Sequence, residues 1–167
     1  MNTDIQQLTI KARTAVYDWY RLLDVHAPIE KLFVCLSPQV ELILPEGPLR
    51  GTSDFESWYL GRAGDTRFPG VVNLFFDEVH ELKYLDVAII PVAGQAGDQG
   101  APEKWLANVQ LVVRWQAHRW KPPAPKSDLL VFDAWQRWQM QSTPNGAWTI
   151  QQYIVDRLEP LAGSAAL

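Results

Sequence analysis

The chain of 167 residues is 47% apolar and 20% charged, and its formal net charge is −4. These values are typical of one folded globular domain and exclude a largely disordered chain. The negative charge gives no electrostatic reason to expect nucleic acid or an anionic membrane surface as a partner. We expect a single domain over residues 1–162 and a frayed C-terminal tail over residues 163–167.

The chain is rich in aromatic residues and has a single cysteine. Eight Trp, six Phe and five Tyr favour a deep core, a ligand pocket or a subunit interface, because aromatic side chains bury large areas. Cys35 lies in the apolar run LFVCL and is expected to be a small buried residue. With neither a signal-peptide apolar region nor an apolar run of ~20 residues, the sequence predicts a cytoplasmic protein without a membrane span.

Two helices are predicted at the start of the chain. Apolar residues recur at helical spacing between positions 8 and 23, and Thr3 or Asp4 is a suitable cap for this helix. Pro28 disfavours helix at the residue before it and suits the first turn of a new one. A short second helix is therefore expected over IEKLFVCL.

The next segment combines a strand, a turn and a third helix. VELIL is expected to be a strand that the turn residues PEGP close. After Arg50 and Gly51, either Thr52 or Ser53 is expected to cap a helix that carries FESWY. The stretch GRAGDTRFPG is expected to be a loop.

From Val71 onward the pattern alternates with a period of two, which predicts long strands. GQAGDQGAPE is expected to be a long hairpin loop, KPPAPK a turn, and TPNG a hairpin turn. One face of the first of these strands is expected to carry the following residues: Leu74, Phe76, His80, Leu82 and Tyr84.

The two middle strands bring a possible ion pair together. On each of them one face is apolar and the other is mixed, and Arg114 and Asp133 both belong to the mixed faces. Counting from the KPPAPK turn places Asp133 opposite Arg114, so a cross-strand ion pair is the favoured interpretation. The alternative is an acid of raised pKa inside a pocket, with Arg114 tuning it or binding an anionic group. The face that points inward decides between them, and the turn register alone does not.

All helices come early and the sheet comes late, which argues for an α+β half-open cone around one pocket. The helix followed by LFVCLSPQVELILP, EGPLRGTSDFESWY and NGAWTIQQYIVD resembles the NTF2-like superfamily, in its SnoaL-like bacterial branch, over nearly the whole chain. The resemblance implies N-terminal helices packed on a curved, mostly antiparallel sheet. This superfamily hosts isomerases, dehydratases, cyclases, hydrolases and binding modules, so the fold alone selects no activity.

The resemblance also implies candidate catalytic residues. Ketosteroid isomerases of the superfamily carry a general-base carboxylate at the end of the first strand, where this chain has Leu44. Their first-helix tyrosine and neutral carboxylic acid resemble Tyr20 and Asp133. SnoaL-type cyclases resemble this chain at an acidic residue of the last strand, Asp156. An oxyanion site without the isomerase base is therefore expected, with His80 or Asp156 as the candidate base.

The three histidines have separate interpretations. His80 lies on an apolar strand face, where a structural, hydrogen-bonded histidine is favoured over a general base. A dipole contact at a helix end accounts for His26, and His118 is expected to be exposed. Because the histidines are far apart in sequence and no ligand motif is present, we expect no bound metal and no nucleotide cofactor.

Aromatic residues divide between the pocket and an interface. Trp58 and Tyr59 are expected to line the cone mouth together with Tyr20, the alternative being plain helix-to-sheet packing. A group of three tryptophans is expected to contact a second sheet in a homodimer, since long strands need cover on their outer face. These residues are Trp115, Trp135 and Trp138.

The sequence thus predicts a homodimer whose cone binds a small, largely apolar organic molecule without a cofactor. If it is an enzyme, proton transfer, dehydration or cyclisation is expected, and Trp58, Tyr59 and Arg114 are expected to contact the ligand. The alternative is a non-catalytic binding or assembly module, which the missing carboxylate at Leu44 favours. A cavity of several hundred cubic ångströms with converging polar groups would favour the first hypothesis.

Overall fold

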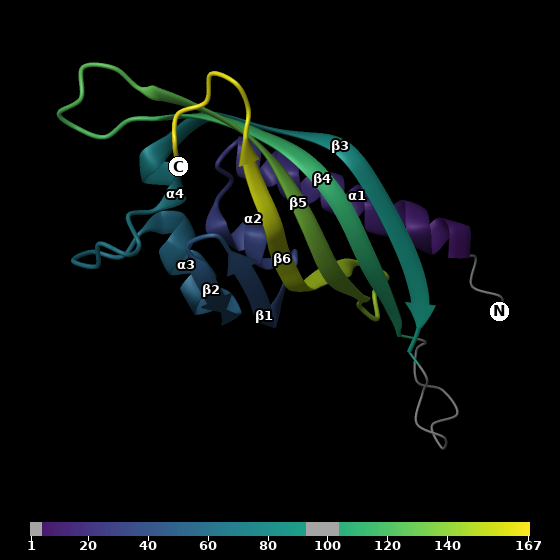
Figure 1. Cartoon of the computed structure of the whole chain (residues 1–167). Helices are drawn as coiled ribbons and strands as arrows, with labels where there is room; N and C mark the ends of the chain where they lie inside the picture. Colours follow the sequence, from purple (N-terminus) through teal and green to yellow (C-terminus); the bar gives the residue numbers. More distant parts are fainter. Residues whose placement is uncertain (1–4, 93–103) are drawn as a thin grey trace.

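The computed structural model describes residues 5–92 and 104–167. Helices lie against one face of a curved six-stranded sheet whose strand order is β2-β1-β6-β5-β4-β3 (Figure 1). The predicted caps at Thr3 and Asp4 and the predicted loop GQAGDQGAPE lie outside these residues. The predicted α+β cone is confirmed.

The long first helix supplies one apolar face to the core. The helices of the described residues are α1 (Ile5–Asp24), α2 (Ile29–Phe33), α3 (Gly51–Leu60) and α4 (Val71–Leu74). The stripe predicted for α1 is confirmed, and its buried members are Ala12, Val16, Trp19, Tyr20 and Leu23. No helix in residues 5–92 or 104–167 combines the length and the hydropathy needed to cross a membrane.

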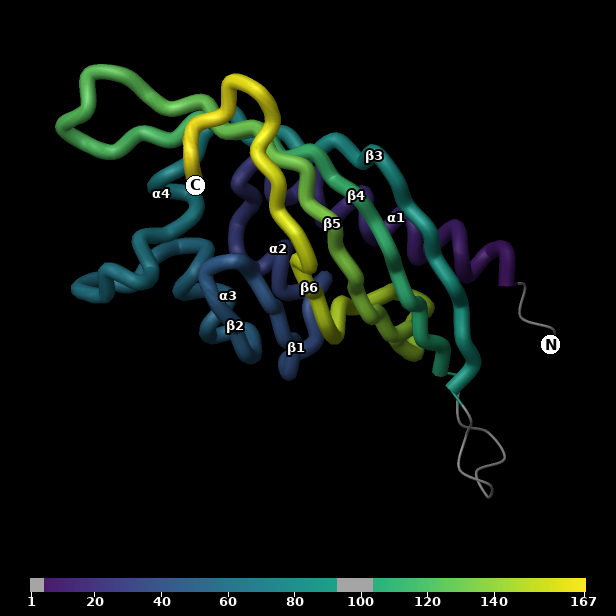
Figure 2. Tube along the Cα trace, in the orientation of Figure 1, coloured from purple at the N-terminus to yellow at the C-terminus, as the bar shows by residue number. Residues whose placement is uncertain are grey.

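The sheet is antiparallel except where the short first strand joins the last. β1 pairs parallel with β6, and the other neighbours pair antiparallel. The trace in Figure 2 shows β3 to β6 as long, bent strands that pass over α1. The strands are β1 (Leu36–Leu44), β2 (Gly47–Arg50), β3 (Phe75–Pro91), β4 (Trp105–Arg119), β5 (Asp128–Ser142) and β6 (Trp148–Pro160).

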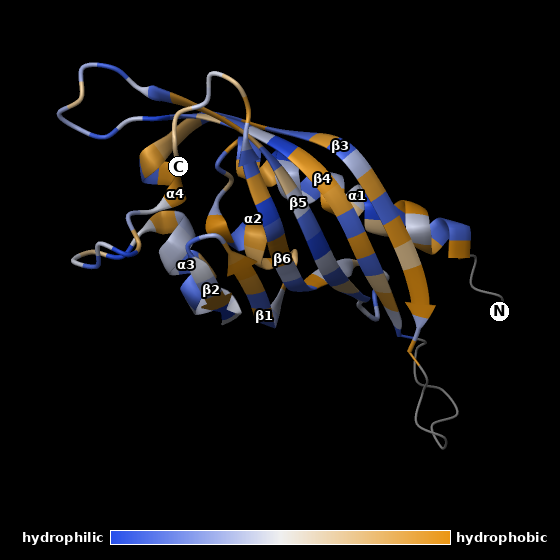
Figure 3. Ribbon diagram, viewed as in Figure 1, coloured by the Kyte–Doolittle hydropathy of each residue, from blue (hydrophilic) through white to orange (hydrophobic). Residues whose placement is uncertain are grey.

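The apolar faces of β4 and β5 point toward the helices. Apolar and polar residues alternate along the strands, as Figure 3 shows by colour. The alternate residues of β4 from Ala107 to Val113 are at most 2% exposed, whereas Asn108 and Gln110 between them are exposed. The mixed faces of both strands therefore form the outer surface of the sheet.

Three local predictions around α3 are wrong. Neither Thr52 nor Ser53 caps the helix, because Arg50 is the N-cap and its backbone N–H donates to the Asp54 carboxylate at 3.0 Å. PEGP is more than a turn, since the chain from Gly47 forms β2 and pairs with β1. Residues 71–74 form the short helix α4 instead of the start of a strand.

A bulge changes which residues of β3 face the helices. Asp77 has a φ of 52°, and the strand register shifts around it. Because of this extra residue Phe76 is 42% exposed, and Glu78 is buried among the inward residues. A second register shift after Leu82 turns Tyr84 outward, where it is 54% exposed. The predicted shared face of β3 is therefore wrong at Phe76 and Tyr84, which point away from His80.

The C-terminal tail is held against β5. The backbone N–H of Val131 donates to the Ser164 hydroxyl at 2.9 Å, and the N–H of Ala165 donates to the Leu129 carbonyl at 2.8 Å. The prediction of a frayed tail is therefore wrong. These bonds return the end of the chain, Leu167, to the wall of the cavity described below.

Candidate functional site

A cavity of about 120 Å³ lies between the helices and the inner face of the sheet. Its wall is mostly apolar, and Leu44, Trp58, Val113 and Val155 are among its residues. An outer depression of about 490 Å³ adjoins it. The residues that line both are Leu44, Glu46, Trp58, Val71, Phe75 and Leu167.

The cavity is smaller than the several hundred cubic ångströms set as the criterion for a ligand site. An engineered apolar cavity of ~150 Å³ in another protein holds benzene, so this volume suits one ring. The polar side chains of the wall are Glu46, Glu78, His80, Gln136 and Tyr153.

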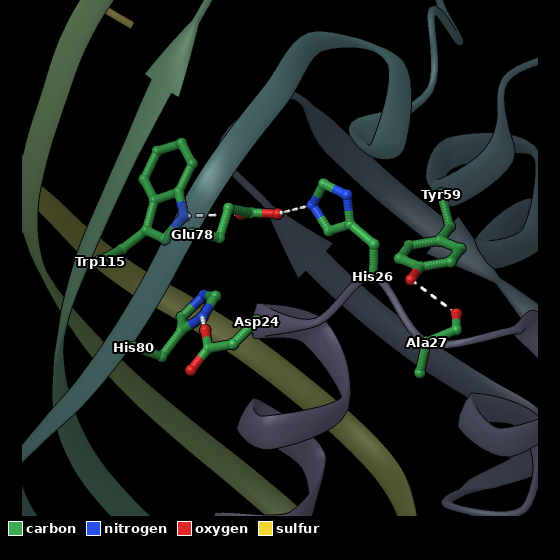
Figure 4. A network of polar contacts seen from close by, with 7 residues as sticks. All are labelled: Asp24, His26, Ala27, Tyr59, Glu78, His80 and Trp115. Atoms are coloured by element: carbon green, nitrogen blue, oxygen red, sulfur yellow. Dashed lines mark hydrogen bonds and ion pairs between the residues drawn. The ribbon is translucent and has the colours of Figure 1, made fainter.

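His80 forms a histidine–carboxylate pair with the last residue of α1. Its Nδ1 lies 2.6 Å from Oδ1 of Asp24 (Figure 4). Since a carboxylate only accepts, Nδ1 carries the proton, and Nε2 of the neutral ring is the basic atom. The ring also stacks on Tyr20, with centroids 4.8 Å apart, which fixes its plane. The His80 side chain is 11% exposed and lines the cavity.

Glu78 forms a second such pair on the same strand. One carboxylate oxygen accepts a hydrogen bond from Trp115 Nε1 at 2.8 Å, and the other lies 2.5 Å from Nε2 of His26. Figure 4 shows the three side chains in a row, with the His80 pair beside them. The Glu78 side chain is only 5% exposed, so its charge depends on these partners.

A buried amide accepts hydrogen bonds from two aromatic side chains beside the cavity. Oε1 of Gln136 accepts hydrogen bonds from the Tyr20 hydroxyl and from Trp138 Nε1, each at 2.9 Å. Burial raises the pKa of Tyr20 well above its ordinary value and raises the pKa of Tyr153 to about 12. Both phenols therefore stay protonated at neutral pH. Gln136 and Tyr153 line the cavity. Tyr20 does not line it and is connected to it through its hydrogen bond to Gln136.

Solved structures support the architecture, although sequence comparison alone does not. No protein-family model matches the chain, and no curated protein matches it. A candidate aromatic ring hydroxylase from Novosphingobium aromaticivorans is similar with a TM-score of 0.66 and 13% identity, over 96% of each chain. A candidate scytalone dehydratase from the same organism gives 0.60 and 14%, over 98% of this chain and 90% of that one. A hexachlorocyclohexane dehydrochlorinase from Novosphingobium barchaimii gives 0.54 and 12%, over 97% and 98%.

The chain has the NTF2-like fold. Together with the cone of helices and curved sheet, these matches confirm the architecture that the resemblance implied. Identities of at most 14% establish likeness of fold, so the chemistry of this NTF2-like chain has to be argued from its own residues.

Two predicted catalytic carboxylates lie on the opposite face of this NTF2-like sheet. Asp133 accepts hydrogen bonds from Nε and Nη2 of Arg114 at 2.9 and 3.0 Å, and Asp156 accepts two from Arg137 at 2.7 Å. The arginine in each pair lowers the pKa of its carboxyl group, the reverse of a neutral acid. Neither carboxylate nor Arg114 lines the cavity. Of the two interpretations of Asp133, the structure contains the cross-strand ion pair.

The predicted aromatic sites are partly rearranged. Trp58 lines the cavity as predicted. Tyr59 does not: it is 1% exposed and donates its hydroxyl to the Ala27 carbonyl at 2.8 Å. The interface prediction is wrong for Trp115, which lines the cavity, and for Trp138, which is 3% exposed in the core.

The surroundings of His26, His118 and Cys35 can now be compared with their predictions. His26 meets Glu78, which goes beyond the dipole contact first assigned to it. His118 is about one-third exposed and stacks on Phe76 at 5.4 Å, so it is not a freely exposed residue. Burial raises the pKa of the Cys35 thiol, as in an unreactive, partly buried cysteine. Within residues 5–92 and 104–167, no three His, Cys, Asp or Glu side chains gather as metal ligands would.

Sequence reasoning missed Asp24, Glu78 and Gln136. Gln136 left a signal, because it is the one polar residue in the face of β5 that runs from Leu130 to Met140. Glu78 would follow from the alternation only if the bulge at Asp77 were known. Nothing in the sequence pairs Asp24 with His80, which lies 56 residues away.

Proposed function

We propose that the chain binds a small, largely apolar carbonyl compound and removes a proton from the carbon next to the carbonyl. His80 is the general base, and the reaction needs no cofactor. The observation that carries this proposal is the Asp24–His80 pair in the wall of a mostly apolar cavity. Two of the structural neighbours, a candidate scytalone dehydratase and a hexachlorocyclohexane dehydrochlorinase, have names that denote eliminations, which supports this class.

Asp24 contributes in two ways. Its bond to Nδ1 fixes the tautomer and the ring, so that Nε2 is the atom offered to a ligand. Its negative charge, close to the ring, stabilises the imidazolium that forms when His80 accepts a proton.

The developing enolate oxygen needs hydrogen-bond donors. Gln136 and Tyr153 line the cavity, and the raised pKa of Tyr153 keeps its hydroxyl protonated. Tyr20 orients Gln136 through the bond to Oε1. Tyr20 is therefore a hydrogen-bond donor, as predicted, but it donates to the Gln136 amide instead of to the ligand. Preorganised donors of this kind stabilise charge that develops in the transition state.

Deuterium exchange into cyclohexanone tests the proposal, because this ketone is small and largely apolar and carries acidic carbon-bound protons. In D₂O the wild-type protein is expected to incorporate deuterium next to the carbonyl well above the buffer rate, as followed by proton NMR. A rate equal to that of buffer would contradict the proposal. It would favour the non-catalytic binding or assembly module that the sequence left as an alternative.

We also propose that a second copy of the chain covers the outer face of the sheet. This face carries exposed apolar side chains, with Tyr84 54% and Val79 50% exposed, and Trp135 lies on it under the Arg157 guanidinium at 3.6 Å. Light scattering is expected to give twice the chain mass of 19.0 kDa, and Tyr84→Lys is expected to give one chain mass. Val25→Lys, at a position 72% exposed outside the sheet, is the control. A wild-type monomer would contradict this arrangement. A cytoplasmic location stays a prediction.

A further inference from the structure

Glu78 is a buried carboxylate in the cavity wall that the proposed base does not use. Its partners come from two other elements: Trp115 from β4 and His26 from the chain after α1. A buried carboxylate is costly, so one that faces a ligand cavity needs an explanation. The contact with His26 allows a proton to pass between the imidazole and the carboxylate.

Two residues with a strained backbone hold this pair in place, one in each of the two segments that supply it. In the described part of the chain, the non-glycine residues with positive φ are His26 at 47° and Asp77 at 52°. One of them is a member of the pair, and the other directly precedes Glu78. Such strain persists only where the surrounding structure requires it.

The helix end shows what His26 replaces. The N–H of His26 donates to the Leu23 carbonyl at 3.0 Å, and the N–H of Ala27 donates to the Leu22 carbonyl at 2.9 Å. This is a Schellman motif, in which glycine is the usual residue at the position of His26. The chain keeps an imidazole where glycine would relieve the strain, and that imidazole reaches Glu78.

The bulge at Asp77 has the complementary effect. It allows both Phe75 and Glu78, three residues apart, to line the cavity. After the bulge the strand alternates regularly, so Glu78 and His80 face the same side, with their Cα atoms about 7 Å apart. Both side chains line the cavity, so one bound ligand can contact a base at one carbon and an acid at the substituent of the next carbon.

We propose that Glu78, positioned by His26 and Trp115, is the proton donor of a dehydration, and that the substrate is a β-hydroxy carbonyl compound. This inference rests on the proposed function, because it gives the carbanion made by His80 a leaving group on the neighbouring carbon.

The overall reaction is the elimination of water from the substrate. Nε2 of His80 takes the proton from the carbon next to the carbonyl, and the C–H electron pair forms the new C=C bond. The bond from the neighbouring carbon to the hydroxyl breaks, and the proton held by the Glu78–His26 pair passes to that oxygen. The products are an enone and water, His80 is left protonated, and the pair is left one proton short. The His26 side chain is 24% exposed, so solvent can return the proton to the pair.

Two matched probes separate this inference from the proposed function. Cyclohexanone reports proton removal by deuterium exchange, and 3-hydroxycyclohexanone reports elimination by the ultraviolet absorbance of cyclohexenone. Glu78→Gln is expected to lower elimination about 10²–10⁴-fold more than it lowers exchange. Wild type that exchanges but does not eliminate would overturn the inference and leave the proposed function intact. Absence of exchange in wild type would overturn both.

A second variant guards against misfolding of the first. Asparagine tolerates a left-handed backbone, so His26→Asn keeps the helix end and removes the imidazole. It is expected to lower elimination more than exchange, in the same sense as Glu78→Gln, with thermal melting as the check on folding. Equal losses of elimination and exchange in both variants would show a purely structural pair and overturn the inference.

Discussion

His80→Asn is expected to lower deuterium exchange into cyclohexanone by about 10²–10⁴-fold, the usual contribution of a positioned general base. The ring lines the cavity, and its Nδ1 is occupied by Asp24 at 2.6 Å, so the substitution removes the basic atom offered to the ligand. NMR of the ketone in D₂O measures the rate. Asp24→Asn is expected to give a smaller loss, because Nε2 remains but its tautomer and charge are no longer fixed.

Asp133→Asn is the matched control for His80→Asn. Asp133 was the leading candidate acid from the sequence, yet it lies on the outer face in a pair with Arg114. Its removal is expected to leave exchange unchanged and to cost about 0–1 kcal/mol of stability, as for a partly exposed ion pair. That cost disappears in acid. Because the pKa of Asp133 is lowered in the folded state, the contribution of the pair is complete above the carboxyl's ordinary pKa of 3.8 and is lost as the pH falls from there through the lower folded pKa. Full exchange activity in His80→Asn, or its loss in Asp133→Asn, would contradict the assigned site.

Phe55→Ala is expected to lower the free energy of unfolding by about 3–5 kcal/mol. Phe55 is fully buried at 0% exposure and joins α3 to α1 through Trp19, with ring centroids 5.7 Å apart. It also stacks on Tyr59 at 5.9 Å and contacts Trp58 at 5.7 Å. The substitution leaves a cavity where three aromatic rings meet, and urea unfolding measures the loss.

Val34→Ala is the control for this core substitution. Val34 is 75% exposed, so its truncation is expected to change stability by no more than about 0.5 kcal/mol. A loss of less than about 1 kcal/mol for Phe55→Ala would contradict the packing of α3 against α1 through Phe55 and Trp19. It would also contradict the position of Trp58 in the cavity wall.

The sequence by itself determined most of the regular elements and the register of β4 against β5. The stripe of α1 and the alternation of β4 and β5 are properties of neighbouring residues, so periodicity alone predicts them. The pairing of Arg114 with Asp133 followed from counting back from the turn, and the register confirms it. The likeness to NTF2-like proteins follows from the order of these elements.

Only the tertiary structure decided the inner face of the sheet and the membership of the site. Because the helices cover the apolar faces of β4 and β5, Asp133 lies on the outer face of the sheet and Trp115 lies in the cavity wall. Asp24 reached His80, and His26 reached Glu78, across gaps of 56 and 52 residues. The reason is physical: local spacing fixes which residues share a face, but a bulge, a strained helix end and the packing of one layer on another fix where that face points.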